Sequence, residues 1–477
     1  MDYKGSVTSF WGLLTTLLIL GVLALSLWGN SNNINPRYLF IDEQITFYPI
    51  AKILSPSGLD EWLWLVSDGN DHRYGRLLWN AIALFALIPT KLFGESSQII
   101  AGREAGAVFL LFSYLLLTYT FIQKPAIRFF ALLTLICLPY NSYYMSIPKP
   151  EPIMILCAAA FLYFYKKNNL SLGKPYWIFL GMAFGAKISF LLPLLALLCA
   201  AILFHIEAKK ILTLSAEFCF TIAYLVLGFS IANPFFIPTF LAIGFALLGV
   251  MLASKLTATS FATVLLLVIA SSIILLAYPP IREYAIGDLL DFTGARHAFG
   301  DWARATFLRI NDGDPSNTQN FTSWFVYLCK ILSPSTPIAA GAYLIGIALF
   351  MATQMHWLTN IRQNRENQLL MSTILFGIGI ALLLSPMLSV KNRLWGMYFL
   401  PGLIFFQLGF FSALDSRLTL LSQHKKILNT PYFAMLAFAV ILTIVVWLPL
   451  FIADFIFLAT KNINIHQSPL PPHLIGI

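Results

Sequence analysis

Apolar runs about as long as a membrane is thick recur along almost the whole chain. A transmembrane helix needs roughly 20 consecutive apolar residues, whereas a strand of a membrane barrel alternates over about 10. Of the 477 residues, 58% are hydrophobic and only 11% are charged, against roughly 25% charged residues in soluble domains. The pattern therefore predicts an all-α, polytopic integral membrane protein with a single membrane domain over residues 1–477.

The apolar runs predict about 13 transmembrane helices. Their expected bounds are 10–28, 104–122, 129–146, 152–165, 175–187, 189–205, 211–231, 236–252, 260–278, 336–354, 368–386, 397–414 and 431–451. The first run is too long for the apolar core of a signal peptide, which has about 7 to 15 residues, so we interpret it as an uncleaved helix. The cysteines form no close pair and no Cys-x-x-Cys, so we expect neither a disulfide framework nor a zinc site.

Basic residues set the predicted orientation. With the N-terminus in the cytoplasm, every inner link carries lysine or arginine, as the positive-inside rule expects. The net charge of +9 is therefore interpreted as a topology signal and not as a nucleic-acid-binding surface. Counting residues 77–93 as a further span would reverse this orientation, so we expect an interfacial or partly buried helix there, on the outer side. The outer segments are then a first loop over 29–102, a second over 279–335 and a short tail over 452–477.

An acidic pair, Asp42-Glu43, follows the first span on the predicted outer side. An acid at the boundary of the bilayer marks a functional site by default. Because low-dielectric surroundings raise the pKa of a carboxyl group toward the working range, Asp42 is a candidate general base for a hydroxyl acceptor. Glu43 is a candidate for orienting a ligand. The alternative is a solvated acid pair in a loop.

A second polar group, Pro148-Lys149-Pro150-Glu151-Pro152, interrupts an apolar hairpin of two spans. A plain turn has little need of both charges, and a cation and an acid at membrane level must pair or bind a polar ligand. We expect Lys149 and Glu151 to face the same cavity as the first acidic pair.

Further cations stand at predicted outer helix ends. Gly181 and Gly185 have the spacing of a small-xxx-small packing face, and Lys187 follows them at the interface, where it either snorkels or holds a lipid phosphate. The glycine spacing is one residue short of a Walker A phosphate loop. Arg103 and Arg393 oppose the positive-inside bias, so binding of an anionic ligand is weighed equally with headgroup anchoring.

The order of these motifs resembles the GT-C superfamily of polytopic glycosyltransferases, in particular the branch of protein O-mannosyltransferases and lipid A aminoarabinose transferases. The matching elements are Asp42-Glu43, Leu92-Phe93-Gly94-Glu95, Arg103, Glu151 in place of the commoner aspartate, Gly181 to Lys187, and Asn392 to Pro401. The His/Lys-Pro-Pro-Leu element of that branch is replaced by His72-Arg73-Tyr74-Gly75-Arg76-Leu77, so its lipid-phosphate contact falls to Arg73 or Arg76 or is lost. No sizeable outer domain is expected after the last helix.

The resemblance implies transfer of a sugar from a polyprenyl-phosphate carrier to a glycan, lipid or protein hydroxyl on the outer face, with inversion. In this interpretation Asp42 is the base and Glu43 and Glu151 position sugar or acceptor. The carrier phosphate is held by Lys149, Lys187, Arg103, Arg393 and Arg73. A bacterial inner membrane is the expected location.

No cofactor is indicated with certainty, and dependence on a divalent metal is left open because relatives differ and no Asp-x-Asp occurs. The cluster of Asp68, Asp71 and His72 is interpreted as solvated loop polarity in preference to a metal site. Two other functions remain open. A flippase or transporter for a lipid-linked sugar would show related halves, which are not apparent, and an outer-face glycan polymerase or ligase would use the loop over 279–335.

Overall fold

The protein is helical throughout the described part of the chain. The computed structural model describes residues 3–32, 41–67, 76–168, 171–187, 190, 193–199, 211–233, 321–360, 367–384, 399–423 and 430–460. Within these ranges every named element is a helix and no strand occurs. The predicted fold class, an all-α polytopic membrane protein, is confirmed.

Four helical stretches in the described ranges are long and apolar enough to cross a membrane. They are Phe10–Asn30, Ser96–Phe121, Pro337–Gln354 and Phe433–Thr460. Shorter apolar helices accompany them, among them Leu77–Phe93 and Pro125–Cys137. The predicted spans 236–252 and 260–278 lie outside the described residues, so the expected number of about 13 spans stays a prediction.

The chain divides into two compact units. The first comprises Met1–Gln44, Phe93–Lys149 and Gly313–Ile477, and the second comprises Ile45–Leu92 and Pro150–Asp312. The helices of the first unit are α1 (Tyr3–Asn30), α5 (Ser96–Phe121), α6 (Pro125–Cys137), α7 (Asn141–Tyr144), α16 (Phe321–Leu332), α17 (Pro337–Asn360), α18 (Asn367–Leu384), α19 (Leu400–Gln423), α20 (Thr430–Leu442), the π-helix η6 (Thr443–Trp447) and α21 (Leu448–Thr460). Those of the second are most of α2 (Ile41–Leu54), α3 (Leu59–Ser67), α4 (Leu77–Phe93), α8 (Pro150–Lys167), α9 (Trp177–Ala186) and α11 (Ile211–Ala232).

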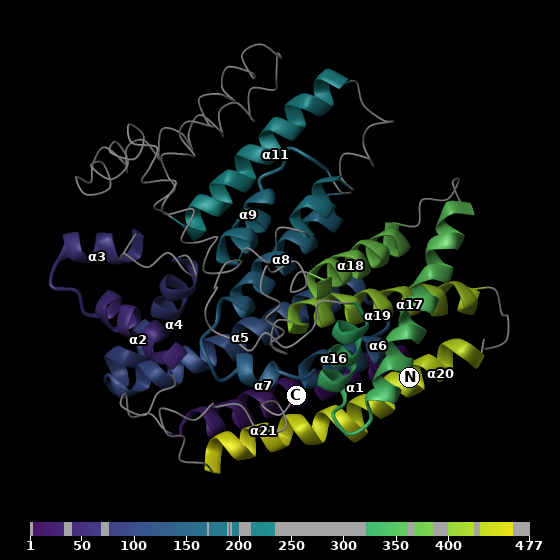
Figure 1. Cartoon of the computed structure of the whole chain (residues 1–477), viewed down its shortest axis with the longest axis horizontal. Helices are drawn as coiled ribbons and strands as arrows, with labels where there is room; N and C mark the ends of the chain where they lie inside the picture. Colours follow the sequence, from purple (N-terminus) through teal and green to yellow (C-terminus); the bar gives the residue numbers. More distant parts are fainter. Residues whose placement is uncertain are drawn as a thin grey trace. The chain divides into compact units, whose positions relative to one another are not determined.

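In the first unit, α20, η6 and α21 follow one another without a break and form a long rod, drawn in yellow in Figure 1. The last predicted span, 431–451, therefore extends to Thr460, because the apolar run continues past residue 451. Trp447 of η6 donates its indole N–H to the carbonyl oxygen of Leu332 at 2.7 Å. π-helical turns are rare and frequently occur at functional sites.

α1 packs against α21 where both helices end. A Cβ atom added at Gly29 would lie 2.9 Å from Cδ1 of Phe455, so a larger residue there would force the Phe455 ring to move. The side-chain amide of Asn32 donates to the carbonyl oxygens of Leu458 at 3.2 Å and Ala459 at 2.8 Å. These bonds satisfy carbonyl groups at the end of α21 that have no partner within the helix.

The span predicted over 129–146 is not one helix. α6 ends at Cys137, because Leu138, the residue before Pro139, has left the helical conformation and Tyr140 has a φ of 69°. The Asn141 amide donates to carbonyl groups in the last turn of α6, and its Oδ1 accepts the Tyr114 hydroxyl at 2.6 Å. The carbonyl groups that the break leaves without helical partners are thus hydrogen-bonded inside the protein. Within a membrane this is necessary, because no water is present to bind them.

In the second unit, α9 and α11 cross at backbone contact distance. A Cβ atom at Gly181 would lie 2.1 Å from the carbonyl oxygen of Leu225. One at Gly228 would lie 2.0 Å from that of Ile178. The predicted small-xxx-small packing face on α9 is therefore confirmed, and its partner is α11.

Candidate functional site

The Lys187 ammonium forms an ion pair with Oε1 of Glu151. Glu151 lies in the first turn of α8, where a negative charge is favoured by the helix dipole. Lys187 lies at the C-terminal end of α9, where an extended backbone carries the chain out of the helix. Their side chains are only 3% and 12% exposed. Two of the residues predicted for the site are thus brought together in a nearly water-free place.

Asn233, at the end of α11, contacts the backbone of α9 close to Lys187. Its side-chain amide donates to the carbonyl oxygen of Gly185 at 3.0 Å, two residues before Lys187. The side chain of Asn233 is fully buried. The sequence analysis did not single it out, although an asparagine between an apolar run and a proline is a usable signal.

Arg76, the residue before α4, contacts the end of α11 through its backbone. Its backbone N–H donates to the carbonyl oxygen of Ala232 at 2.8 Å, next to Asn233. Its guanidinium carbon lies 4.5 Å from the centre of the Trp79 ring, a cation–π contact. Arg76 is fully buried. We call Arg76, Glu151, Lys187 and Asn233 the polar cluster of the second unit.

Two buried acceptor atoms of the polar cluster have no hydrogen-bond partner among the residues that the structure describes. Within the described part of the chain, Oε2 of Glu151 and Oδ1 of Asn233 make no hydrogen bond. Glu151 is 2% exposed and Asn233 is fully buried. A buried polar atom without a hydrogen bond costs about 1–3 kcal/mol, so such atoms are expected where a ligand completes the bonding.

The close packing of α9 on α11 positions the cluster. Gly181 and Gly185 of α9 face Leu225 and Ala232 of α11, and the contact runs up to the end of both helices. Lys187 and Asn233 are therefore held at a common end. Larger residues at the glycines would separate the helices and with them the two side chains.

Arg103, also predicted to hold phosphate, lies in the first unit. Its Nη1 donates to the carbonyl oxygens of Asn30 at 3.0 Å and Asn32 at 2.8 Å. The neighbouring Glu104 accepts from Ser26 at 2.8 Å and from the Asn30 side chain at 2.7 Å. Arg103 thus caps the C-terminal end of α1. Its role in phosphate binding stays a prediction.

The remaining predicted residues are placed less completely. Asp42 and Glu43 lie in the first turn of α2, and their side chains lie outside the described part. Lys149 is half-buried and directly precedes α8. Arg73 and Arg393 lie outside the described residues. Among the described residues, no group of three or more His, Cys, Asp or Glu could hold a metal ion.

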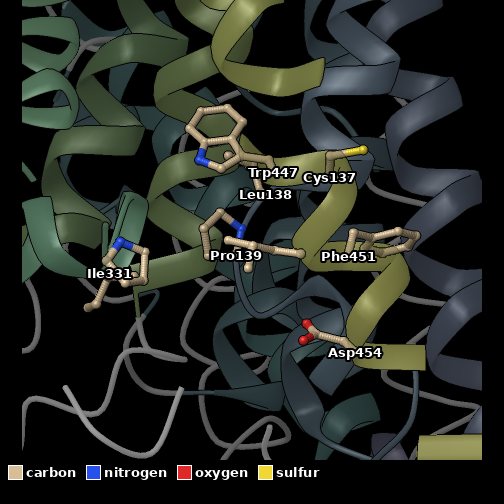
Figure 2. Close-up of a pocket in the computed structure, with 9 residues that line it drawn as sticks. Cys137, Leu138, Pro139, Ile331, Trp447, Phe451 and Asp454 are labelled. Carbon is tan, nitrogen blue, oxygen red and sulfur yellow. The ribbon is translucent and has the colours of Figure 1, made fainter. Parts of the chain in front are cut away.

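A small pocket in the first unit contains an acid that the sequence analysis did not single out. It is lined by Cys137, Leu138, Pro139, Ile331, Pro334, Trp447, Leu450, Phe451 and Asp454. Figure 2 shows Asp454 on α21 among these mostly apolar side chains. Its Oδ2 accepts the Ser142 hydroxyl at 2.5 Å, and it is 4% exposed. A single acid within the apolar run of α21 is the signal that identifies it.

Comparisons with known proteins leave the family open. No protein-family model matches the sequence, and no curated protein sequence matches it. Among solved structures, the chain is similar to the crystal structure of ArnT from Cupriavidus metallidurans bound to undecaprenyl phosphate. The match covers 98% of this chain and 74% of that chain, at 13% sequence identity and a TM-score of 0.41. A likeness of this extent assigns no function.

Proposed function

We propose that this protein is a membrane glycosyltransferase that moves a sugar from a polyprenyl-phosphate donor to a hydroxyl acceptor, with inversion. The observation that carries the proposal is the polar cluster of the second unit. It contains two cations, the largely covered Lys187 and the fully buried Arg76. It also contains two buried acceptor atoms, Oε2 of Glu151 and Oδ1 of Asn233, that make no hydrogen bond within the described residues. Cations suit a phosphate and acceptors suit sugar hydroxyl groups, so the cluster matches a phosphosugar. The motif order that resembles GT-C glycosyltransferases supports the same function.

In the proposed reaction, the acceptor oxygen forms a bond to the anomeric carbon and its proton passes to Asp42. The bond from the anomeric carbon to the phosphate oxygen breaks, and the carrier phosphate leaves with the electron pair. Because the phosphate is a competent leaving group, the protein needs a base and nearby cations more than a strong acid. Lys187 supplies such a cation, and Glu151 positions the sugar or the acceptor.

The other roles come from the sequence. Glu43 assists Asp42, and Lys149, Arg103, Arg73 and Arg393 contribute to phosphate binding. A divalent metal remains open. The site faces the outer side of a bacterial inner membrane, and the N-terminus lies in the cytoplasm.

The test is sugar transfer by purified protein in liposomes that contain polyprenyl-phosphate hexoses and a lipid or glycan acceptor. Asp42→Asn should reduce transfer by about 10²–10⁴-fold, the range of general base catalysis, while carrier binding is retained. Asp60→Asn, an exposed acid on α3, is the control and should keep full activity. Unchanged transfer by Asp42→Asn would remove Asp42 as the base.

The same liposomes test the other two functions. Movement of labelled carrier between leaflets without any transfer would indicate a flippase. Growth of long glycan chains on the carrier would indicate a polymerase. Either result from the wild-type protein would replace the proposed function.

A further inference from the structure

We infer that Asn233 and Glu151 form a subsite for the hydroxyl groups of the donor sugar. The inference rests on the proposed function and names the part of the donor that each side of the polar cluster binds. Asn233 belongs to none of the motifs named in the sequence analysis, and the packing of α11 on α9 brings it next to Gly185.

The orientation of the Asn233 amide follows from its surroundings. Its Nδ2 lies 3.0 Å from the carbonyl oxygen of Gly185 and 3.3 Å from that of Phe229. Both neighbours are acceptors, so the amide must present its NH₂ group to them. The oxygen of the amide is therefore directed away from these carbonyls, and it has no hydrogen-bond partner within the described residues.

The two carboxylate oxygens of Glu151 also differ in their contacts. Oε1 holds the Lys187 ammonium, and Oε2 makes no hydrogen bond within the described residues. The two unsatisfied oxygens belong to side chains linked through a short path, from Asn233 to Gly185, along the chain to Lys187, and from Lys187 to Glu151. We assign both oxygens to the sugar side of the cluster.

Two oxygen acceptors of this kind select a ligand that donates hydrogen bonds. A carboxylate and an amide oxygen also suit a hard metal ion, but the Lys187 ammonium already contacts the carboxylate and would repel a cation. A neutral polyol meets no such repulsion. Its hydroxyl groups donate to Oε2 and Oδ1, while the linked phosphate is left to Lys187 and Arg76.

The test compares binding of two kinds of ligand. One is bare polyprenyl phosphate, and the other is a polyprenyl-phosphate hexose in which the hexose is mannose or glucose. Asn233→Ala should weaken binding of the preferred hexose carrier by about 3- to 10-fold, the value of one hydrogen bond. Binding of the bare carrier should change less than about 2-fold. Lys187→Met should weaken binding of the bare carrier and of the hexose carrier alike, because the proposed contact of Lys187 is with the phosphate that both ligands share.

A matched control lies on the same helix. Thr221 is fully buried on α11 and accepts the N–H of Gly173 at 2.8 Å, three turns from Asn233. Thr221→Val should leave the ratio of the two affinities unchanged. Thermal unfolding of each variant in detergent separates loss of fold from loss of the ligand contact.

The outcomes separate this inference from the proposed function. Equal weakening of both carriers by Asn233→Ala would make the residue a positioning residue for Lys187 and overturn the subsite. The same holds if neither carrier is affected, or if the wild-type protein binds no hexose carrier more tightly than the bare one. A selective effect on hexose carriers in a protein that transfers no sugar would keep the subsite and refute the glycosyltransferase.

Discussion

The Lys187 ammonium pairs with the Glu151 carboxylate across 36 positions of sequence, from the end of α9 to the start of α8. Each of these residues alone would leave a buried charge in an apolar surrounding. Together they give the second unit a polar centre at one end of its helices. Both residues were predicted to belong to the site. Their direct contact explains how two charged side chains can lie in an apolar surrounding, because each neutralises the other.

Removal of one partner from this ion pair should destabilise the protein more than removal of both. Lys187→Met should lower the free energy of unfolding by about 3–5 kcal/mol, because Glu151 is left as an uncompensated buried charge. The double variant with Glu151→Leu should recover much of that loss. Denaturant titration in detergent measures the difference. Lys91→Met, at an exposed lysine on α4, is the control, and an equal loss there would contradict the prediction.

The crossing of α9 and α11 should not tolerate a side chain at Gly228. Its Cβ atom would lie 2.0 Å from the carbonyl oxygen of Ile178, so Gly228→Ala must push the two backbones apart at a cost of about 1–3 kcal/mol. At Gly346 on α17 no atom of the described residues lies within 4 Å of an added Cβ, so Gly346→Ala should be neutral or stabilising by up to about 1 kcal/mol. Thermal unfolding of the two variants compares them, and equal melting temperatures would show that the crossing is loose.

Asp415 of α19 should act as the cap of α6. Its carboxylate accepts the backbone N–H groups of Gln123 at 2.8 Å and Lys124 at 3.0 Å, whereas Lys124 itself makes no side-chain cap. Asp415→Ala should cost about 1–2 kcal/mol of unfolding free energy. Glu95→Ala, at an N-cap that makes no side-chain bond, should stay within about 0.5 kcal/mol. A similar effect of both variants would rule out a capping role.

The Glu61 carboxyl on α3 should titrate below its ordinary range. The Ser57 backbone N–H and hydroxyl both donate to Glu61, at 2.6 and 2.7 Å, and lower its pKa. A carboxyl with a lowered pKa in the folded state stabilises above its unfolded pKa, and that contribution is lost as the pH falls through the folded pKa. Ser57→Ala should raise the pKa part of the way back.

Carbon NMR of protein with labelled glutamate, followed between neutral and acid pH, measures this titration. Asp60→Asn beside it leaves the two Ser57 donors in place and serves as the comparison. An unchanged Glu61 pKa in Ser57→Ala would show that the hydroxyl donor is absent in solution.

Local patterns predicted much of the helical structure. The run that became α5 and the glycine pair of α9 follow from apolar length and small-residue spacing, which neighbours in sequence determine. α16 was missed inside the expected second outer loop, although Trp324, Leu328 and Ile331 form a buried stripe at helical spacing. The helix expected over 129–146 was wrong because one proline and one left-handed tyrosine interrupt an otherwise continuous apolar run.

By itself the sequence determined that this chain is an all-helical membrane protein, because the thickness of a bilayer and the need to satisfy backbone groups inside it leave few other choices. It also indicated that Glu151 and Lys187 are charged residues at membrane level, which must pair or bind a polar ligand. Only the tertiary structure decided that they pair, that Asn233 contacts the backbone of Gly185 near Lys187, and that Arg76 contacts the backbone beside Asn233. Hydrophobic periodicity shows which face of a helix is buried but carries no record of which distant residue lies against it.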